Sequence, residues 1–259
     1  MTIRIATSAM IGLLAALLAV LWTAGVWSNE PGNDGASDPE KERAEQVGHA
    51  FNEAEDAPVA QVGAAVITMA DYQMSRRLVE VNVEFMEGVI AEGGPPATGF
   101  QERLDIIERA GIANVALGGL IVKTALAETA RDRGFSPDED EVAESVAATR
   151  ELAEKGEAPS VSGFAEVVGE RYWAEILPER IRVQQIVDQL RADVRQGIEN
   201  PEDWAAAWAA MEEQAVTGAD IEVIDSAAIE PASVSGAIEY LHSYWGLDYF
   251  AGAQSSRPR

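Results

Sequence analysis

The chain has 259 residues, with 44 acidic against 19 basic side chains and a formal net charge of −25 at pH 7. Nucleic acids and anionic lipid head groups repel such a polyanion, which argues against a nucleic-acid-binding protein. The sequence contains no cysteine, which excludes a disulfide framework, a Cys-based zinc site and a lipoprotein signal.

Residues 1–28 are predicted to form a membrane signal anchor. Ile5 to Trp27 carries no charge and is long enough to cross a bilayer as a helix. Arg4 precedes this run and an acidic flank follows it, so the bulk of the chain is expected on the extracytoplasmic side. The alternative is a signal peptide, cut near the small residues Thr23–Ala24–Gly25, which would release a secreted protein.

Residues 29–56 are predicted to be an acidic flexible linker. Proline and glycine are frequent near its start, and acidic residues greatly outnumber basic ones. Such a composition does not bury a core. The stretch "DPEKERAEQVGHAFNEAE" is expected to add a short surface helix near the end of the linker.

A folded domain is predicted over residues 57–226. Val59 to Val62 reads as a strand, Gly63 as a turn and Val66–Ile67 as a second strand. Thr68 is a candidate N-cap, with Asp71 completing a near capping box, for a helix that runs to about Ala91.

This helix carries two apolar stripes at helical spacing. Either neighbouring helices cover both stripes, as in a buried core helix, or the second stripe is open and binds peptide, a role that methionine suits. The first stripe comprises Tyr72, Val79, Val83, Met86 and Ile90. The second, the candidate peptide-binding site, comprises Met74, Leu78, Val81, Phe85 and Val89.

More helices are predicted downstream. Between Phe100 and Arg133, the pair Gly118–Gly119 marks either a kink or a close helix–helix approach. Gly134 is expected to cap the end of this segment. In "SPDEDEV", Ser136 is the expected N-cap and Glu139 the residue that closes the capping box. The helix dipole explains the acidic run there better than a metal site does.

The C-terminal half is expected to hold two long helices and one strand. Pro178 begins or kinks the first helix, and Asn200 caps the second. Asp220 to Asp225 alternates polar and apolar residues and is predicted to pair with the first strands, because a lone strand is not stable. Residues 227–259 form an aromatic-containing tail that is expected to dock on the body.

Four segments, in this order, resemble SurA/PrsA-type extracytoplasmic chaperones. They are "VAQVGAAVITMADY", "ALGGLIVKTALAETARDRGFSPDEDEV", "VVGERYWAEILPERIRVQQIVDQL" and "WAAAWAAMEEQAVTGADIEVID". The resemblance covers about Val59 to Asp225. It departs from the family pattern at Ala64, where a turn asparagine or glycine is usual, and at Gly118–Gly119.

The resemblance implies a mainly α fold with a small β element: a SurA N-terminal-like helical domain that binds unfolded or partly folded polypeptides. No segment remains for a parvulin prolyl-isomerase domain, which needs about a hundred residues. We therefore expect a holdase for secreted or envelope proteins, anchored outside the cytoplasm by its N-terminal helix. We expect no isomerase activity, no cofactor and no nucleic-acid partner, and self-association remains open.

The sequence offers little sign of catalysis. His49 and His242 lack a metal-ligand pattern, and there is no G-x-S-x-G, Walker or G-x-G-x-x-G motif. Two alternatives to the holdase stay open. One is a non-catalytic scaffold or partner subunit of a membrane complex, docked through the aromatic tail. The other is an enzyme, either a residual prolyl isomerase or a carboxylate-pair hydrolase.

Overall fold

The computed structural model describes residues 39–54, 57–91, 100–224, 229 and 232–246, which are mainly helical with one small antiparallel sheet. The predicted signal anchor lies outside the described residues. The chain divides into two compact units. Unit 1 comprises the segment up to Gly48 and Pro137–Gln184, and unit 2 comprises His49–Ser136 and the segment from Gln185 onward.

The sheet of unit 2 confirms that the first and last strands pair. It consists of β1 (Pro58–Val62), β2 (Ala65–Thr68) and β3 (Ile221–Val223) in the order β2-β1-β3, with both pairings antiparallel. Gly63 provides the turn after β1 with a φ of 59°, a backbone conformation that glycine adopts without steric cost. Its amide donates a 2.8 Å hydrogen bond to the carbonyl of Asp220, which joins the hairpin to the approach of β3.

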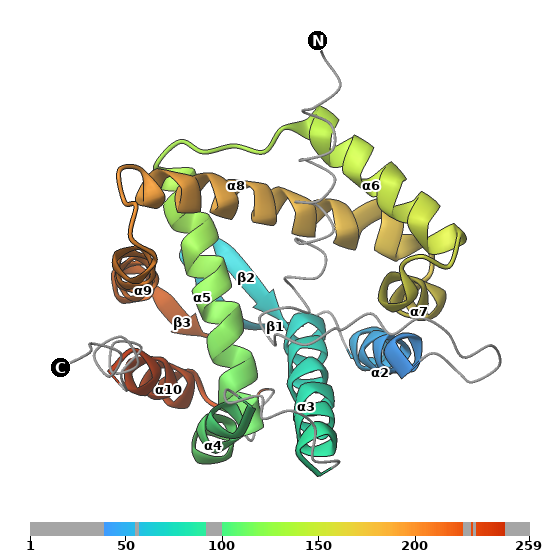
Figure 1. Ribbon diagram of the computed structural model, residues 1–259, viewed down its shortest axis with the longest axis horizontal. Coiled ribbons are helices and arrows are strands. Elements are labelled where there is room, and N and C mark those ends of the chain that lie inside the picture. Colours follow the sequence, from blue (N-terminus) through green and yellow to red (C-terminus); the bar gives the residue numbers. More distant parts are fainter. Residues whose placement is uncertain (1–38, 55–56, 92–99, 225–228, 230–231, 247–259) are drawn as a thin grey trace. The chain divides into compact units, whose positions relative to one another are not determined.

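Helix α5 (Ile112–Asp132) lies at the centre of unit 2, with α3 on one side and α9 and α10 on another (Figure 1). Helix α5 is the one helix within the described ranges that is long and apolar enough to cross a membrane. Core helices of soluble proteins pass the same test, and the burial of Leu117, Ile121 and Leu126 gives α5 the role of a core helix. The other helices of unit 2 are α3 (Met69–Ala91), α4 (Phe100–Ala110), α9 (Pro201–Gly218) and α10 (Val234–Gly246).

Gly118 permits a close helix–helix approach, one of the two alternatives predicted for the glycine pair. Helix α5 continues through it without interruption. A Cβ atom on Gly118 would meet the ring of Tyr240 in α10, whereas one on Gly119 would meet nothing within 4 Å. Ala237 and Leu241 of α10 are buried as well. The described part of the tail is therefore docked on the body.

Helix α5 ends in a Schellman motif, as the position of Gly134 predicts. The amide of Gly134, which has a φ of 85°, donates to the carbonyl of Arg131, and the amide of Phe135 donates to Ala130 at 3.0 Å. These two bonds use carbonyls that the helix end leaves without intrahelical partners.

The predicted start of the next helix, α6 (Glu139–Glu154), was wrong by two residues. The N-cap is Asp138, not Ser136, because the Asp138 carboxylate accepts from the amides of Asp140 and Glu141 at 3.0 and 3.1 Å. Glu139 does not close a capping box on Ser136. It binds Arg182 of α8 (Leu177–Arg195) instead.

Unit 1 contains α6, α7 (Pro159–Val168), the π-helix η1 (Tyr172–Ile176), the first part of α8 and most of α2 (Pro39–Glu53). Helix α2 lies within the segment expected to be a flexible linker with a surface helix, yet its Ala44 and Val47 are buried. The backbones of α2 and α7 approach closely at Gly163, where a Cβ atom would overlap the carbonyl of Lys41. The absence of a side chain at Gly163 thus lets the backbone of α7 pack directly against the backbone of α2.

The π-helix η1 ends at Ile176, two residues before Pro178, and α8 begins at Leu177. Proline lacks an amide hydrogen, and its ring clashes with the carbonyl four residues earlier. The widened turn, in which the Leu177 amide donates to the carbonyl of Tyr172, is a common way to accommodate such a break in the α-helical ladder. Further along, Asn200 caps α9 through a 3.0 Å bond from the Glu202 amide, as predicted.

Candidate functional site

The candidate site lies on α3, whose start is fixed by the predicted capping box. The Asp71 amide donates to the Thr68 hydroxyl at 3.2 Å, and that hydroxyl donates to the Asp71 carboxylate at 2.8 Å. The Thr68 amide is 3.4 Å from the same carboxylate. Reciprocal bonds of this kind satisfy amides that a helix start leaves unpaired, so the register of α3 relative to the sheet is well defined.

The side of α3 that faces α5 is identified by a hydrogen bond. The hydroxyl of Ser75 donates to the carbonyl of Ala116 at 3.1 Å. At about 100° per residue, Asn82 and Met86 fall on the same line as Ser75. The two apolar stripes flank this line, one on each side. The two stripes therefore form one broad apolar surface that is centred on the contact with α5.

Several residues of this broad surface are not fully buried. In the first stripe Tyr72 and Met86 are buried, Val79 and Val83 are half-buried, and Ile90 is 43% exposed. In the second stripe Val81 is buried, whereas Met74, Leu78, Phe85 and Val89 are half-buried. The structure therefore brings all five predicted site residues to one side of α3 and leaves four of them partly accessible.

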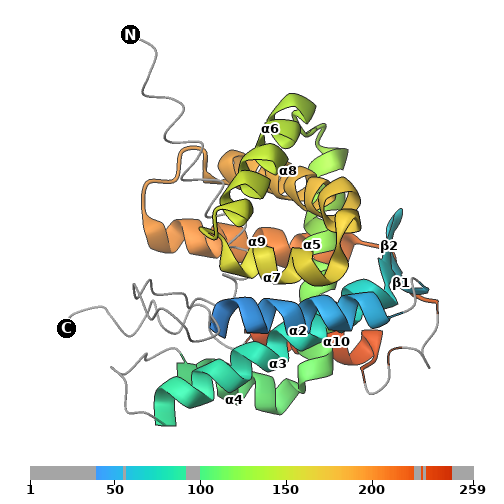
Figure 2. The same cartoon turned by 90° about the vertical axis from the view of Figure 1, so that its right-hand side faces the viewer.

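Helix α4 supports the second half of this surface. It lies beside α3 (Figure 2), and the rings of Phe85 and Phe100 meet edge to face with centroids 6.3 Å apart. Aromatic pairs favour this geometry, which contributes about 1 kcal/mol beyond area burial. One edge of the Phe85 ring is thus fixed by Phe100, and the residue remains half-buried.

Charged residues occupy the opposite side of α3. The Arg77 guanidinium is 3.0 Å from Glu80 and 3.3 Å from Glu84, and Arg76 is 3.1 Å from Glu80. Both arginines of the helix are thus matched by carboxylates on the same helix. Ion pairs at a protein surface contribute little to stability, about 0–1 kcal/mol each. Their main effect is to leave α3 without uncompensated positive charge.

The C-terminal end of α3 has an unfavourable charge pattern that the sequence analysis missed. A helix C-terminus carries partial negative charge and favours basic side chains. The last turn of α3 contains none, while Glu84 and Glu87 are exposed nearby. The absence of lysine and arginine after Arg77 in this helix was the available signal. This end of the helix therefore carries negative potential that no basic side chain of its last turn compensates.

Tyr72 lies at the other end of α3 with its side chain fully buried. Its hydroxyl has no hydrogen-bond partner among the described residues. Burial raises the pKa of Tyr72, Arg76 lowers it to a smaller extent, and Glu80 raises it again. The phenol is thus held neutral and inaccessible, so it belongs to the core and not to a binding surface.

Unit 1 contains an aromatic cluster of its own. The ring of Tyr172 is 5.3 Å from Phe164 and 4.9 Å from Trp173, centroid to centroid. The guanidinium of Arg150 lies over Trp173 at 5.4 Å, and that of Arg180 lies over Phe164 at the same distance. Burial raises the pKa of Tyr172 to about 12. Phe164 and Tyr172 are buried, so the centre of the cluster is a core that joins α7, η1 and α8.

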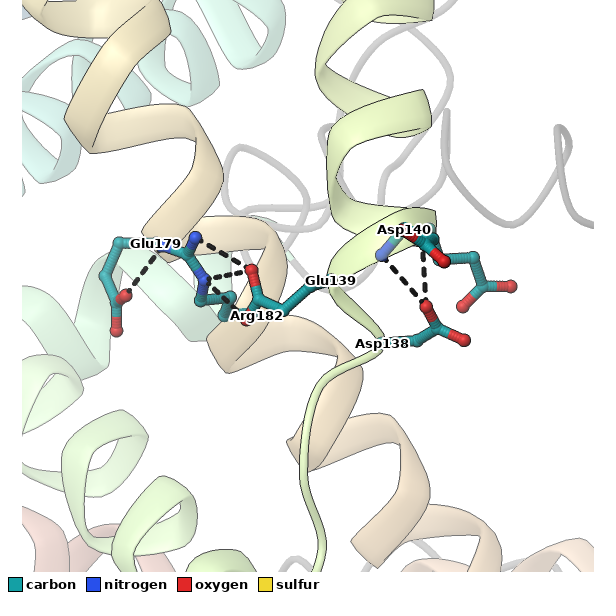
Figure 3. A network of polar contacts seen from close by, with 6 residues as sticks. Asp138, Glu139, Asp140, Glu179 and Arg182 are labelled. Carbon is teal, nitrogen blue, oxygen red and sulfur yellow. Dashed lines mark hydrogen bonds and ion pairs between the residues drawn. The ribbon is translucent and has the colours of Figure 1, made fainter.

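The acidic run at the start of α6 has the structural role that the sequence indicates. Figure 3 shows Asp138 under the first turn and Glu139 reaching across to Arg182. Arg182 donates to both Glu139 oxygens, at 3.0 to 3.2 Å, and to Glu179 at 3.5 Å. Within the ranges that the structure describes, no group of three or more His, Asp or Glu side chains is arranged to hold a metal ion.

Comparisons with protein-family models, with curated proteins and with solved structures find no match for this chain.

Proposed function

We propose that this protein is an extracytoplasmic holdase, a chaperone that binds unfolded segments of secreted or envelope proteins without isomerising them. The observation that carries the proposal is the half-buried apolar surface of α3, where Met74, Leu78, Phe85 and Val89 remain partly accessible. Soluble domains usually cover such a row, and contiguous apolar surface that stays accessible is typical of interaction sites.

The resemblance to SurA/PrsA-type chaperones supports the same function. That resemblance rests on the order of four sequence segments. The first of them forms a hairpin that leads into a long capped helix, and the last ends in a strand that pairs with this hairpin. The specific likeness to a SurA N-terminal domain remains a proposal. So do the membrane anchor and the extracytoplasmic location, since both rest on the composition of residues 1–28.

The energetics fit weak, reversible capture. Full burial of an aliphatic or aromatic side chain is worth about 1.5–3 kcal/mol, so completing the burial of a half-buried one contributes about 1 kcal/mol. Four such side chains, added to the client's own apolar residues, offset part of the cost of association. The resulting affinity is on the order of micromolar to millimolar, which suits a protein that must release its clients.

The test is suppression of client aggregation by the full chain in nanodiscs of zwitterionic lipid. Leu78→Ser and Val89→Ser together should weaken the suppression severalfold. Val66→Ser is the matched control, because Val66 is 50% exposed and lies on β2. Unchanged thermal melting of both variants would show that the fold is intact. Equal suppression by all three proteins would reject α3 as the site, and no suppression by the wild type would reject the holdase.

A further inference from the structure

Helix α10 packs on the rest of unit 2 in the way that an amphipathic helix binds a partner protein. Its main neighbour is α5, and α4 and α9 contact it as well (Figure 1). The buried side chains Val234, Ala237 and Leu241 follow the spacing i, i+3 and i+7, by which amphipathic helices anchor in apolar grooves. The exposed residues on its other side are Ser235, Glu239, His242 and Ser243.

Two glycines let α10 approach α5 closely. Gly118 of α5 leaves space for the ring of Tyr240. A Cβ atom on Gly236 of α10 would lie 2.7 Å from Oδ1 of Asn114. The same Asn114 oxygen accepts a 3.3 Å hydrogen bond from the Ser233 amide. A helix that takes the place of α10 therefore needs small residues in its first turn and a large apolar residue two turns later.

Helix α10 depends on this docking for its own structure. Gly236 lies inside the helix, where glycine is unfavourable. Neither its first turn nor its last carries a charged side chain that complements the helix dipole. A helix of 13 residues with these features is marginal in isolation. Such an element opens and closes as a unit, and each opening exposes the surface of α5 that lies below it.

The chain just before α10 keeps this helix close to its docking surface. Ile229 has no exposed surface and Ala232 is 3% exposed, so the segment that leads into α10 is itself held on the body. An open α10 is therefore present at a high effective concentration. The same helix from a second copy is a poor competitor, since each copy carries a net charge of −25 and the copies repel each other.

We propose that the surface under α10 is a second client-binding site, which selects amphipathic helical segments of the α10 pattern, and that α10 is its built-in competitor. This inference rests on the proposed holdase function and names a class of client for it. Client helices bind when α10 opens, and α10 returns when they leave. The closed state lowers the apparent affinity for every such client and keeps the apolar surface of α5 covered between clients.

A disulfide that holds α10 closed provides a direct test. The chain contains no cysteine, so Asn114→Cys with Gly236→Cys introduces a single pair. A Cβ atom on Gly236 would lie 3.0 Å from Cγ of Asn114, and that Cγ is one bond of about 1.5 Å from the Cβ of Asn114. The two Cβ atoms are therefore at most about 4.5 Å apart, as a disulfide requires.

The probe is a fluorescent peptide with the sequence of residues 232–246, added to the full chain in nanodiscs of zwitterionic lipid. The reduced double variant should bind this peptide. Oxidation of the same protein should weaken the binding about tenfold or more, because α10 no longer opens. An unfolded client protein should displace the peptide from the reduced form. A peptide that carries Leu241→Ser should bind weakly to both forms.

Two substitutions within α10 test the competition without a disulfide. Leu241→Ser in the full chain removes the buried anchor at i+7 and should raise the affinity for the wild-type peptide about tenfold. Ser243→Ala is the matched control, because Ser243 is exposed on the outer side of the same helix, and it should leave the affinity unchanged. Slow amide hydrogen exchange in α5 of both variants would show that the body remains folded.

The outcomes distinguish this proposal from the holdase. Equal binding of the peptide by the oxidised and reduced forms, or no binding by either, overturns the role of α10, as does equal affinity of the wild type and Leu241→Ser. Peptide binding that an unfolded client does not reverse overturns the client site. A dimer of the reduced form in light scattering would show that α10 binds a second copy, and overturns it as well. Each of these results leaves the holdase standing, whereas failure of the wild type and the reduced form to suppress client aggregation overturns the holdase itself.

Discussion

The ring of Tyr240 lies against the backbone of Gly118, so close that a Cβ atom on the glycine would be 3.0 Å from Cδ1 and 3.3 Å from Cε1 of that ring. This relationship joins α10 to the central helix of unit 2. The adjacent Gly119 is exposed, with nothing within 4 Å of its Cβ position. One glycine of the pair is therefore tightly packed against a neighbouring side chain, and the other is not.

Gly118→Ala and Gly119→Ala should consequently have opposite effects on stability. Replacing glycine by alanine in an open helix position stabilises by about 0.5–1 kcal/mol. At Gly118 the added methyl group displaces the Tyr240 ring, and overpacking of this kind costs about 1–3 kcal/mol. Urea denaturation should thus show a higher midpoint for Gly119→Ala and a lower midpoint for Gly118→Ala.

The cause of the loss can be isolated by removing the ring. In a Tyr240→Ala background, Gly118→Ala should become neutral or stabilising, because the methyl group then has space. A loss of the same size in both backgrounds would show that Tyr240 is not the reason that glycine is needed.

A second close approach, in unit 1, predicts that Gly163→Ala is destabilising. The new methyl group would overlap the Lys41 carbonyl, a backbone atom that moves only if α2 shifts as a whole. We expect a loss of about 1–3 kcal/mol and faster amide hydrogen exchange in α2. Lys41→Ala is the control. It removes an exposed 2.7 Å ion pair with Glu166, a contribution of about 0–1 kcal/mol. Similar losses in the two variants would contradict the packing argument.

The structure also predicts the titration of Glu139. Hydrogen bonds from Arg182 hold the pKa of this carboxyl below its ordinary value of 4.5. A lowered pKa means that the folded state binds the proton less tightly than the unfolded state. The stabilisation is therefore complete above about pH 4.5 and is lost as the pH falls through the lowered pKa. Carboxyl-carbon NMR should show Glu139 titrating later on acidification than an unpaired glutamate.

Arg182→Gln should return the pKa of Glu139 to the ordinary range. Arg191→Gln is the control, because Arg191 pairs with Asp188 at 2.9 Å and not with Glu139. An unchanged Glu139 titration in Arg182→Gln would show that the pair is not maintained in solution.

The features that could be predicted from the sequence are those that depend on neighbours along the chain. The capping box of Thr68 and Asp71, the Schellman glycine Gly134 and the cap at Asn200 each require only a few adjacent residues. The pairing of β1 with β3 was predictable for a different reason, because a short strand needs a partner and few candidates remained.

The features that the sequence did not show depend on distant partners. Ser136 and Asp138 are both good N-cap residues by type. In the folded chain Asp138 is the cap, and the adjacent Glu139 binds Arg182, which lies far along the chain. The buried side of α2 was missed because the acidic composition of the segment was given more weight than the helical spacing of Ala44, Val47 and Phe51. On α3, both stripes were recognised, but only the Ser75 bond to α5 showed that they flank one contact.

Ionisation of Tyr172 should destabilise the fold in alkali. Burial raises the pKa of Tyr172 to about 12, from an ordinary value of 10.0, because a phenolate in an apolar cluster loses its hydration. A raised pKa means that the folded state holds the proton more tightly than the unfolded state. The contribution of Tyr172 is therefore fully present below pH 10 and is lost as the pH rises toward 12, by up to about 1.4 kcal/mol per pH unit.

Urea midpoints measured across this range, with phenolate absorbance followed in parallel, should fall more steeply in the wild type than in Tyr172→Phe. Tyr240→Phe is the comparison, because burial also raises the pKa of Tyr240. In this variant the urea midpoint should still fall with rising pH to the extent that Tyr172 causes the fall. An identical alkaline slope in the wild type and Tyr172→Phe would mean that Tyr172 ionises as readily in the folded chain as in the unfolded one, contrary to its burial between Phe164 and Trp173.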